Sequence, residues 1–192
     1  NPAATDSRMG FTLRPPADHE RVNLRWLVLL RWLLVGCAAV LVTVVEVALG
    51  GLPVASLLVV VAVAAAPNVW LGRRIARPGP VPGVGPITAL LIADVGLLTT
   101  MLALSGGPHN PFAVLYLLEV MIAALVLPPS RAAVVGIAGG VAYGGLFLVH
   151  VPLHIHSEDQ LQAHLLGMWL AYGVAAPFVG YGVHKLRRGI AE

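Results

Sequence analysis

Residues 26–49 read WLVLLRWLLVGCAAVLVTVVEVAL, a mostly apolar run that contains one arginine and one glutamate. A helix needs about 20 mostly apolar residues to cross the roughly 30 Å hydrocarbon layer of a membrane. This run is long enough, and five further runs have the same character. The six predicted transmembrane helices are 26–49, 54–71, 87–104, 112–127, 132–151 and 161–183. We therefore expect an all-α fold, a polytopic membrane protein built as a bundle of six transmembrane helices.

The composition excludes the main alternatives to a membrane protein. Of the 192 residues, 58% are apolar and only 11% are charged, and the mean hydropathy is +0.85. Soluble domains carry about 25% charged and about 45–50% apolar residues. Disordered chains contain even fewer apolar residues than soluble domains do. Cys37 stands alone, which excludes an internal disulfide and a multi-cysteine metal site. We expect it to be a small buried apolar residue.

The distribution of basic residues predicts the orientation of the helices. All twelve lysines and arginines precede the first run, lie in its first turns, or follow the second, fourth and sixth runs. Under the positive-inside rule both termini are cytoplasmic, so the net charge of +3 reflects topology and no nucleic-acid partner is expected. The predicted parts are a cytoplasmic tail (1–25), a six-helix transmembrane domain (26–184) and the start of a further cytoplasmic segment (185–192). Arg31 is expected to snorkel toward the inner interface, beside Trp26.

Three acidic residues fall inside the apolar runs, where a charge costs at least ~2.5–3.5 kcal/mol on insertion scales. Asp94 and Glu119 lie near the middle of adjacent helices, roughly 15 and 10 Å from the outer connection between them. At these depths the two acids are placed to share a polar cavity. Functional and structural roles stay open for this pair. Glu46 lies near the outer end of its helix, where a structural role is favoured.

The outer connection between the third and fourth helices contains the sequence GGPHNPF, residues 106–112. Gly106 and Gly107 permit positive φ angles and close approach of a ligand. Asn110 carries an amide donor and an acceptor and is well placed to cap the next helix, whose first turn Pro111 fixes. Phe112 offers an aromatic face at membrane depth. A tight turn without any ligand has the same composition, so both interpretations stay open at this level.

The heptapeptide resembles the GGxxNPF motif of the RegB/PrrB family of redox-responsive sensor histidine kinases. That family has six transmembrane helices with this motif between the third and the fourth. Two other stretches look familiar: Asn23-Leu24-Arg25 with Leu30-Arg31-Trp32 at the start of the first helix, and Gly167-Met168-Trp169 in the sixth. The similarity extends from about residue 23 to the end of the chain.

The resemblance implies a sensor of the ubiquinone/ubiquinol pool in the bacterial inner membrane, a homodimer within a two-component signal transduction system. The expected partners are membrane lipid, the quinone and a cognate response regulator, reached through a cytoplasmic ATP-dependent kinase region beyond residue 192. No catalytic residue is predicted within this segment, and Cys37 does not match the redox-active cysteine of the family. The predicted quinone-binding residues are Gly106, Gly107, Asn110, Pro111 and Phe112, with Asp94 and Glu119 as acceptors that favour the quinol.

Other functional classes remain as alternatives. Asp94 and Glu119 would also suit a small proton-linked transporter, and the domain would also serve as a purely structural anchor. Histidines near the outer face would suit a metal or pH sensor, but their spacing is not diagnostic and no metal site is predicted. These histidines are His109, His150, His154, His156 and His164.

Overall fold

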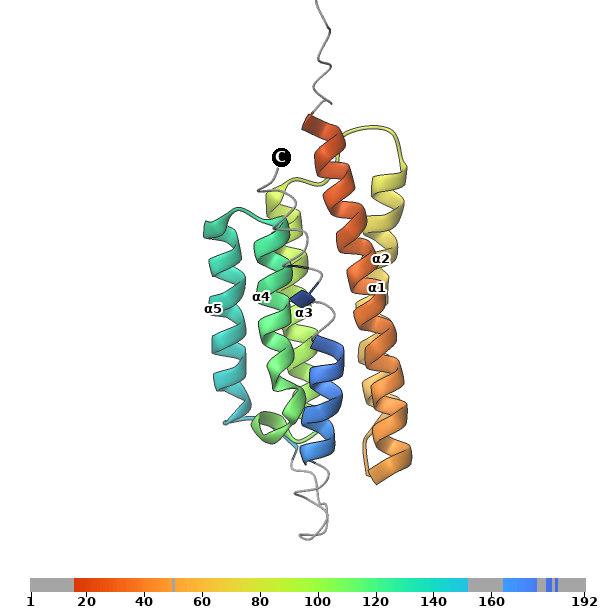
Figure 1. Ribbon diagram of the computed structural model, residues 1–192, viewed down its shortest axis with the longest axis vertical. Helices are drawn as coiled ribbons and strands as arrows, with labels where there is room; N and C mark the ends of the chain where they lie inside the picture. The colour runs from red at the N-terminus through yellow and green to blue at the C-terminus, as the bar shows by residue number, and fades with distance from the viewer. Residues whose placement is uncertain (1–15, 50, 152–163, 176–178, 181, 183–192) are drawn as a thin grey trace, which may run out of the picture.

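The computed structural model describes residues 16–49, 51–151, 164–175, 179–180 and 182, and it has no strand within this part of the chain (Figure 1). Its long helices are α1 (Pro16–Leu49), α2 (Val54–Ala76), α3 (Val84–Leu104), α4 (Leu115–Val126) and α5 (Pro129–Leu146). Two 3-10 helices, η1 (Gly107–His109) and η2 (Pro111–Val114), connect α3 to α4, and a further apolar helix covers His164–Ala175. The predicted all-α fold is confirmed for the described residues.

Successive helices run antiparallel, so their connections gather at two ends of the bundle (Figure 1). We call one the arginine-rich end: it holds the start of α1 and the α2–α3 and α4–α5 connections, with Arg21, Arg77 and Arg131. The opposite end holds residues 105–114 and is called the motif end. Arg21 ties the first end together, because its guanidinium donates to the carbonyl oxygens of Ile75 (2.8 Å), Arg77 (3.2 Å) and Gly79.

Three helices are long and apolar enough to cross a membrane: Arg21–Val47 within α1, then α2 and α3. At most a third of the most apolar window of each is buried, so most of their apolar side chains face outward. That surface suits lipid, where exposed apolar side chains incur no hydration cost. The chain is thus a membrane protein.

Several helix boundaries differ from the sequence prediction, and the structure gives a cause for two of them. Helix α1 begins at Pro16, ten residues before the predicted start, because Arg21 and the buried Leu24 attach its first turns to the bundle. Helix α5 ends at Leu146 rather than at residue 151, since the amide of Phe147 bonds back to Gly144 in a tightened last turn. Beyond it, the amide of Val151 donates to the carbonyl of Ala103 on α3 (2.7 Å).

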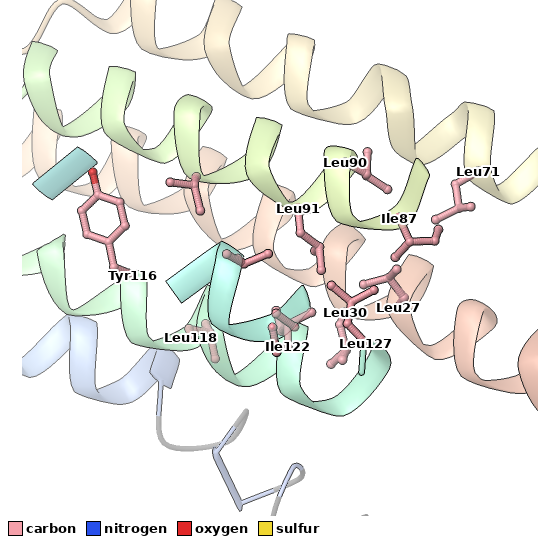
Figure 2. Packing of buried hydrophobic residues seen from close by; sticks show 14 of the residues in the cluster. Leu27, Leu30, Leu71, Ile87, Leu90, Leu91, Tyr116, Leu118, Ile122 and Leu127 are labelled. Atoms are coloured by element: carbon pink, nitrogen blue, oxygen red, sulfur yellow. The ribbon is translucent and has the colours of Figure 1, made fainter. Parts of the chain in front are cut away.

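The core of buried apolar residues lies mainly toward the arginine-rich end (Figure 2). Leu27 of α1, Leu71 of α2 and Leu91 of α3 are fully buried there, and they meet Ile122 of α4 and Val135 of α5. Toward the motif end the α1–α2 pair presents smaller side chains, Ala38 and Ala64, to α3 and α4. Tight packing at one end and small side chains near the middle leave room for a cavity inside the bundle.

Candidate functional site

The heptapeptide forms a compact connector at the motif end. Gly106 has φ 104° and Gly107 has φ 63°, and residues that carry a Cβ rarely adopt such positive φ angles. After this bend η1 and η2 follow in succession, with Asn110 between them. The predicted cap is confirmed: Phe112 donates its backbone N–H to Asn110 Oδ1 at 2.9 Å. The two glycines are needed for the path of the backbone, whether or not a ligand approaches.

The side chain of Asn110 is fully engaged within the connector. Its Nδ2 donates to the carbonyl oxygen of Ser105 (2.6 Å) and to Ser105 Oγ (2.8 Å), while its Oδ1 caps Phe112. An amide nitrogen has two N–H groups, so both donors are used. Phe112 is half-buried and packs against the apolar core. Asn110 therefore holds the turn together, and a ligand that bonded to it would have to break one of these contacts.

Two distant segments fix the connector from outside. A Cβ added to Gly107 would overlap the side chain of His150, which follows α5. A Cβ added to Gly167, in the helix His164–Ala175, would overlap the ring of Pro111. Two of the stretches that resemble the RegB/PrrB family are thus in direct contact. The connector is a rigid joint between α3, α4, the end of α5 and the helix His164–Ala175.

A half-open cavity of about 100 Å³ lies between α1, α2, α3 and α4. Asp94 of α3 and Glu119 of α4 both line it, which confirms the prediction that the two acids share a cavity. Glu119 is only 9% exposed. The remaining wall is apolar except for Arg31. The apolar residues of the cavity wall are Leu34, Val35, Ala38, Val61, Ala64, Leu97, Leu98, Met101, Leu115 and Leu118.

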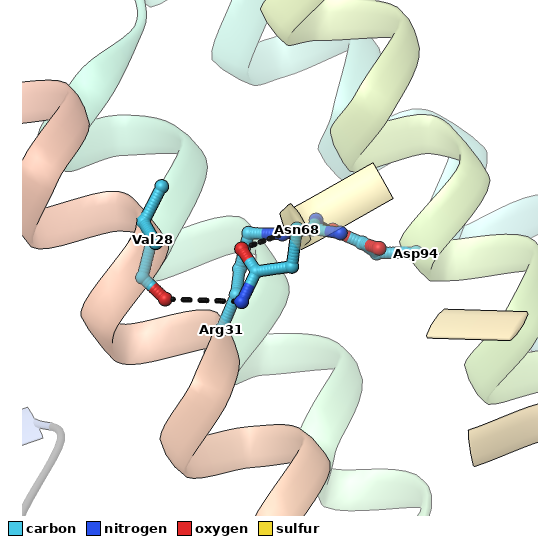
Figure 3. A network of polar contacts seen from close by, with 4 residues as sticks. All are labelled: Val28, Arg31, Asn68 and Asp94. Carbon is cyan, nitrogen blue, oxygen red and sulfur yellow. Dashed lines mark hydrogen bonds and ion pairs between the residues drawn. The ribbon is translucent and has the colours of Figure 1, made fainter. Parts of the chain in front are cut away.

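Arg31 is the charged partner of these acids, and the prediction that it snorkels to the interface is wrong. Its side chain is 5% exposed and forms an ion pair with Asp94, whose side chain is 12% exposed (Figure 3). Arg31 also interacts electrostatically with Glu119. Since α1 begins at Pro16, Arg31 lies several turns inside the bundle. The two carboxyl groups supply the opposite charge that a buried guanidinium needs.

Asn68 orients Arg31 and was missed by sequence reasoning. It is fully buried on α2, accepts from Arg31 Nε through Oδ1 (3.3 Å) and donates through Nδ2 to the carbonyl of Val28 (3.2 Å) (Figure 3). Two signals in the sequence point to this network. The first is that burying an asparagine inside an apolar helix costs free energy. The second is depth: Arg31 lies ten residues after Arg21, and Asp94 lies ten residues after Val84. At about 1.5 Å per residue, Arg31 and Asp94 are both about 15 Å from the arginine-rich end.

The cavity and the connector are structurally continuous. Met101, in the cavity wall, accepts a hydrogen bond from Ser105 Oγ through its carbonyl oxygen (2.7 Å), and Ser105 in turn accepts from Asn110. Leu115 lines the cavity and follows η2 directly. A change in the connector therefore reaches the cavity wall on α3 and on α4 through one or two side chains.

The remaining sequence candidates lie elsewhere. Glu46 Oε2 accepts from the backbone N–H of Leu52 (2.9 Å) and closes the α1–α2 connection, which confirms its structural role. The rings of His109 and His150 lie 6.3 Å apart, but no group of three possible metal ligands occurs among the described residues. His154 and His156 lie outside the described part of the chain.

Comparison with known proteins adds no relative. No protein-family model, curated protein or solved structure matches this chain. The family that residues 106–112 indicate therefore stays a prediction.

Proposed function

We propose that this chain is the membrane sensor region of a redox-responsive histidine kinase of the RegB/PrrB kind, and that it binds ubiquinone and ubiquinol. In this proposal the chain crosses the bacterial inner membrane six times with both termini cytoplasmic and works as a homodimer. Its cytoplasmic kinase region passes the signal to a response regulator.

The observation that carries the proposal is the charged, otherwise apolar cavity that adjoins the heptapeptide. A quinone head group needs hydrogen-bond donors for its two carbonyl oxygens and apolar contacts for its ring and isoprenoid tail. Arg31, Asp94 and Glu119 provide polar groups at one end of the cavity, and Leu97, Leu98, Met101 and Leu115 are among the apolar residues of its wall. The orientation is supported by Arg21, Arg77 and Arg131 at a single end of the bundle.

The connector has a supporting role in this proposal. Gly106 and Gly107 set the bend, Asn110 locks it, and Pro111 and Phe112 seat it against its neighbours. A ligand that displaces the cavity wall on α3 or α4 would shift this joint. Because Pro111 contacts Gly167, the shift would pass to the helix His164–Ala175, which precedes the proposed kinase region.

The test is direct binding of quinone to the purified chain in lipid nanodiscs. We expect quinone in lipid extracts of the protein, and saturable binding of the short-chain ubiquinone-1 by calorimetry. Asn110→Ala is expected to weaken binding by loosening the connector. Gly140→Ala, at a position with open space around it, is the matched control and should bind as the wild type does. An empty extract together with no saturable binding would contradict the proposal.

A proton-linked transporter is a second candidate, favoured by the same intramembrane pair of Arg31 and Asp94. Buried acid–base pairs of this kind occur in proton pathways through membranes. This function predicts substrate-dependent proton movement in liposomes and its loss in Asp94→Asn or Glu119→Gln. Liposomes that bind quinone but move no protons with any substrate would favour the sensor.

A further inference from the structure

The guanidinium of Arg31 is held from two sides and remains part of the cavity wall. Its Nε donates to Asn68 and one terminal nitrogen pairs with Asp94. A guanidinium has five N–H groups, so these two contacts leave donors for a further partner. Asn68, itself fixed by Val28, prevents the side chain from swinging away. Arg31 is thus a pre-oriented hydrogen-bond donor in a pocket whose wall is apolar apart from Arg31, Asp94 and Glu119.

We infer that Arg31 and Glu119 form the polar end of the ligand site and distinguish the oxidised from the reduced ring, and this inference rests on the proposed quinone function. It moves the polar contacts of the ring away from Asn110. Both N–H groups of Asn110 already bond to Ser105, whereas Arg31 and Glu119 line the cavity itself. The apolar wall between Leu97 and Leu118 would contact the ring and the first part of its tail.

The two residues offer opposite hydrogen-bonding chemistry. A guanidinium only donates, whereas the carboxyl group of Glu119 has oxygens that accept. The carbonyl oxygens of a quinone only accept, so the oxidised ring bonds to Arg31. A quinol also donates through its hydroxyl groups, so the reduced ring gains a bond to Glu119. Charge-assisted bonds of this type are about twice as strong as neutral ones. Because a hydroxyl oxygen also accepts, Arg31 can donate to either form, and the bond to Glu119 is the one that only the reduced ring makes.

Binding of the oxidised ring also changes the charge network. A carbonyl that accepts from a remaining N–H group of Arg31 shares the guanidinium charge with Asp94. Since Arg31 is on α1 and Asp94 on α3, weakening their ion pair loosens the contact between these helices. A quinol that donates to Glu119 instead leaves the Arg31–Asp94 pair intact. The redox form of the ligand thereby sets the strength of the α1–α3 contact.

The experiment measures the binding of ubiquinone-1 and of ubiquinol-1, under anaerobic conditions, to the full chain in nanodiscs. Arg31→Lys keeps the charge but loses the planar fork, and we expect roughly tenfold weaker binding of the quinone with a smaller change for the quinol. Glu119→Gln should reverse this order. The controls are Arg131→Gln and Glu46→Gln, which remove an arginine and a glutamate that do not line the cavity, and both should bind both forms as the wild type does.

Each outcome decides between the two levels of the proposal. The inference would be overturned if the wild type binds both forms and if Arg31→Lys and Glu119→Gln leave the ratio of the two affinities unchanged. The quinone function would then still stand. A wild type that binds neither form would overturn both. If Arg31→Lys does not fold, the double variant Arg31→Met/Asp94→Asn removes both charges together. This variant should fold, and its affinity for ubiquinone-1 relative to ubiquinol-1 should fall below that of the wild type. An unchanged ratio of the two affinities would count against the inference.

Discussion

Replacing Arg31 by methionine should destabilise the bundle far more than replacing its partner Asp94 by asparagine. Arg31→Met leaves Asp94 and Glu119 facing each other in a cavity where they are 12% and 9% exposed. Removing one partner of a buried pair costs about 3–5 kcal/mol, because the remaining charge has no compensation. After Asp94→Asn, Arg31 keeps Glu119 as a counter-charge and Asn68 as an acceptor, so the expected cost is about 1–3 kcal/mol.

The double variant Arg31→Met/Asp94→Asn separates this charge interaction from a general packing defect. With both charges removed, the part of the arginine cost that comes from an unpaired Asp94 should disappear, while the part that comes from Glu119 remains. The coupling energy should be about 2 kcal/mol or more. Unfolding of the four proteins by sodium dodecyl sulfate in mixed micelles, followed by far-ultraviolet circular dichroism, gives the required free energies. Effects that add within about 0.5 kcal/mol would refute the ion pair as the organising contact of the cavity.

Three further changes test the connector and the helix contacts. Gly107→Ala should cost about 2 kcal/mol or more, because the residue has φ 63° and a methyl group would overlap His150, whereas Gly140→Ala should be neutral or slightly stabilising; thermal unfolding measures both. Asn110→Ala removes the cap and two bonds to Ser105, so we expect a loss of about 1–3 kcal/mol and faster proteolysis between α3 and α4; unchanged proteolysis would contradict the locked turn. Tyr116→Phe removes the bond to Thr99 (2.8 Å) and should cost about 0.5–1.5 kcal/mol, with the ligand affinity unchanged.

The helices were predictable from the sequence because their apolar runs are long and end at clear breaks. Pro53 and the Pro/Gly-rich residues 78–83 bound α2 and the start of α3, and Asn110 with Pro111 begins the next helical stretch. The lengths of α1 and α5 were less predictable. Their ends depend on tertiary contacts, such as Arg21 with Ile75, that leave no pattern in the local sequence.

The candidate site was predictable only in part. Asp94 and Glu119 were found because a charge in an apolar helix is conspicuous, and their depths place them together. Arg31 was equally conspicuous, but the apparent helix start at Trp26 made it look interfacial. The true start at Pro16 moves it inside the bundle. Asn110 shows another limit, since the motif identifies the residue but does not reveal that Ser105 already uses its donors.

Photolabelling locates the bound ligand within the membrane domain. An azido derivative of ubiquinone, activated by light on the protein in nanodiscs and mapped by mass spectrometry, labels the residues next to the ring. We expect label on Leu97, Leu98 and Met101 of α3 and on Leu115 and Leu118 of α4, which line the cavity, and protection of both groups by excess ubiquinone-1. Protectable label confined to the outer groove of α4 and α5, around Gly136 and Tyr143, would contradict it.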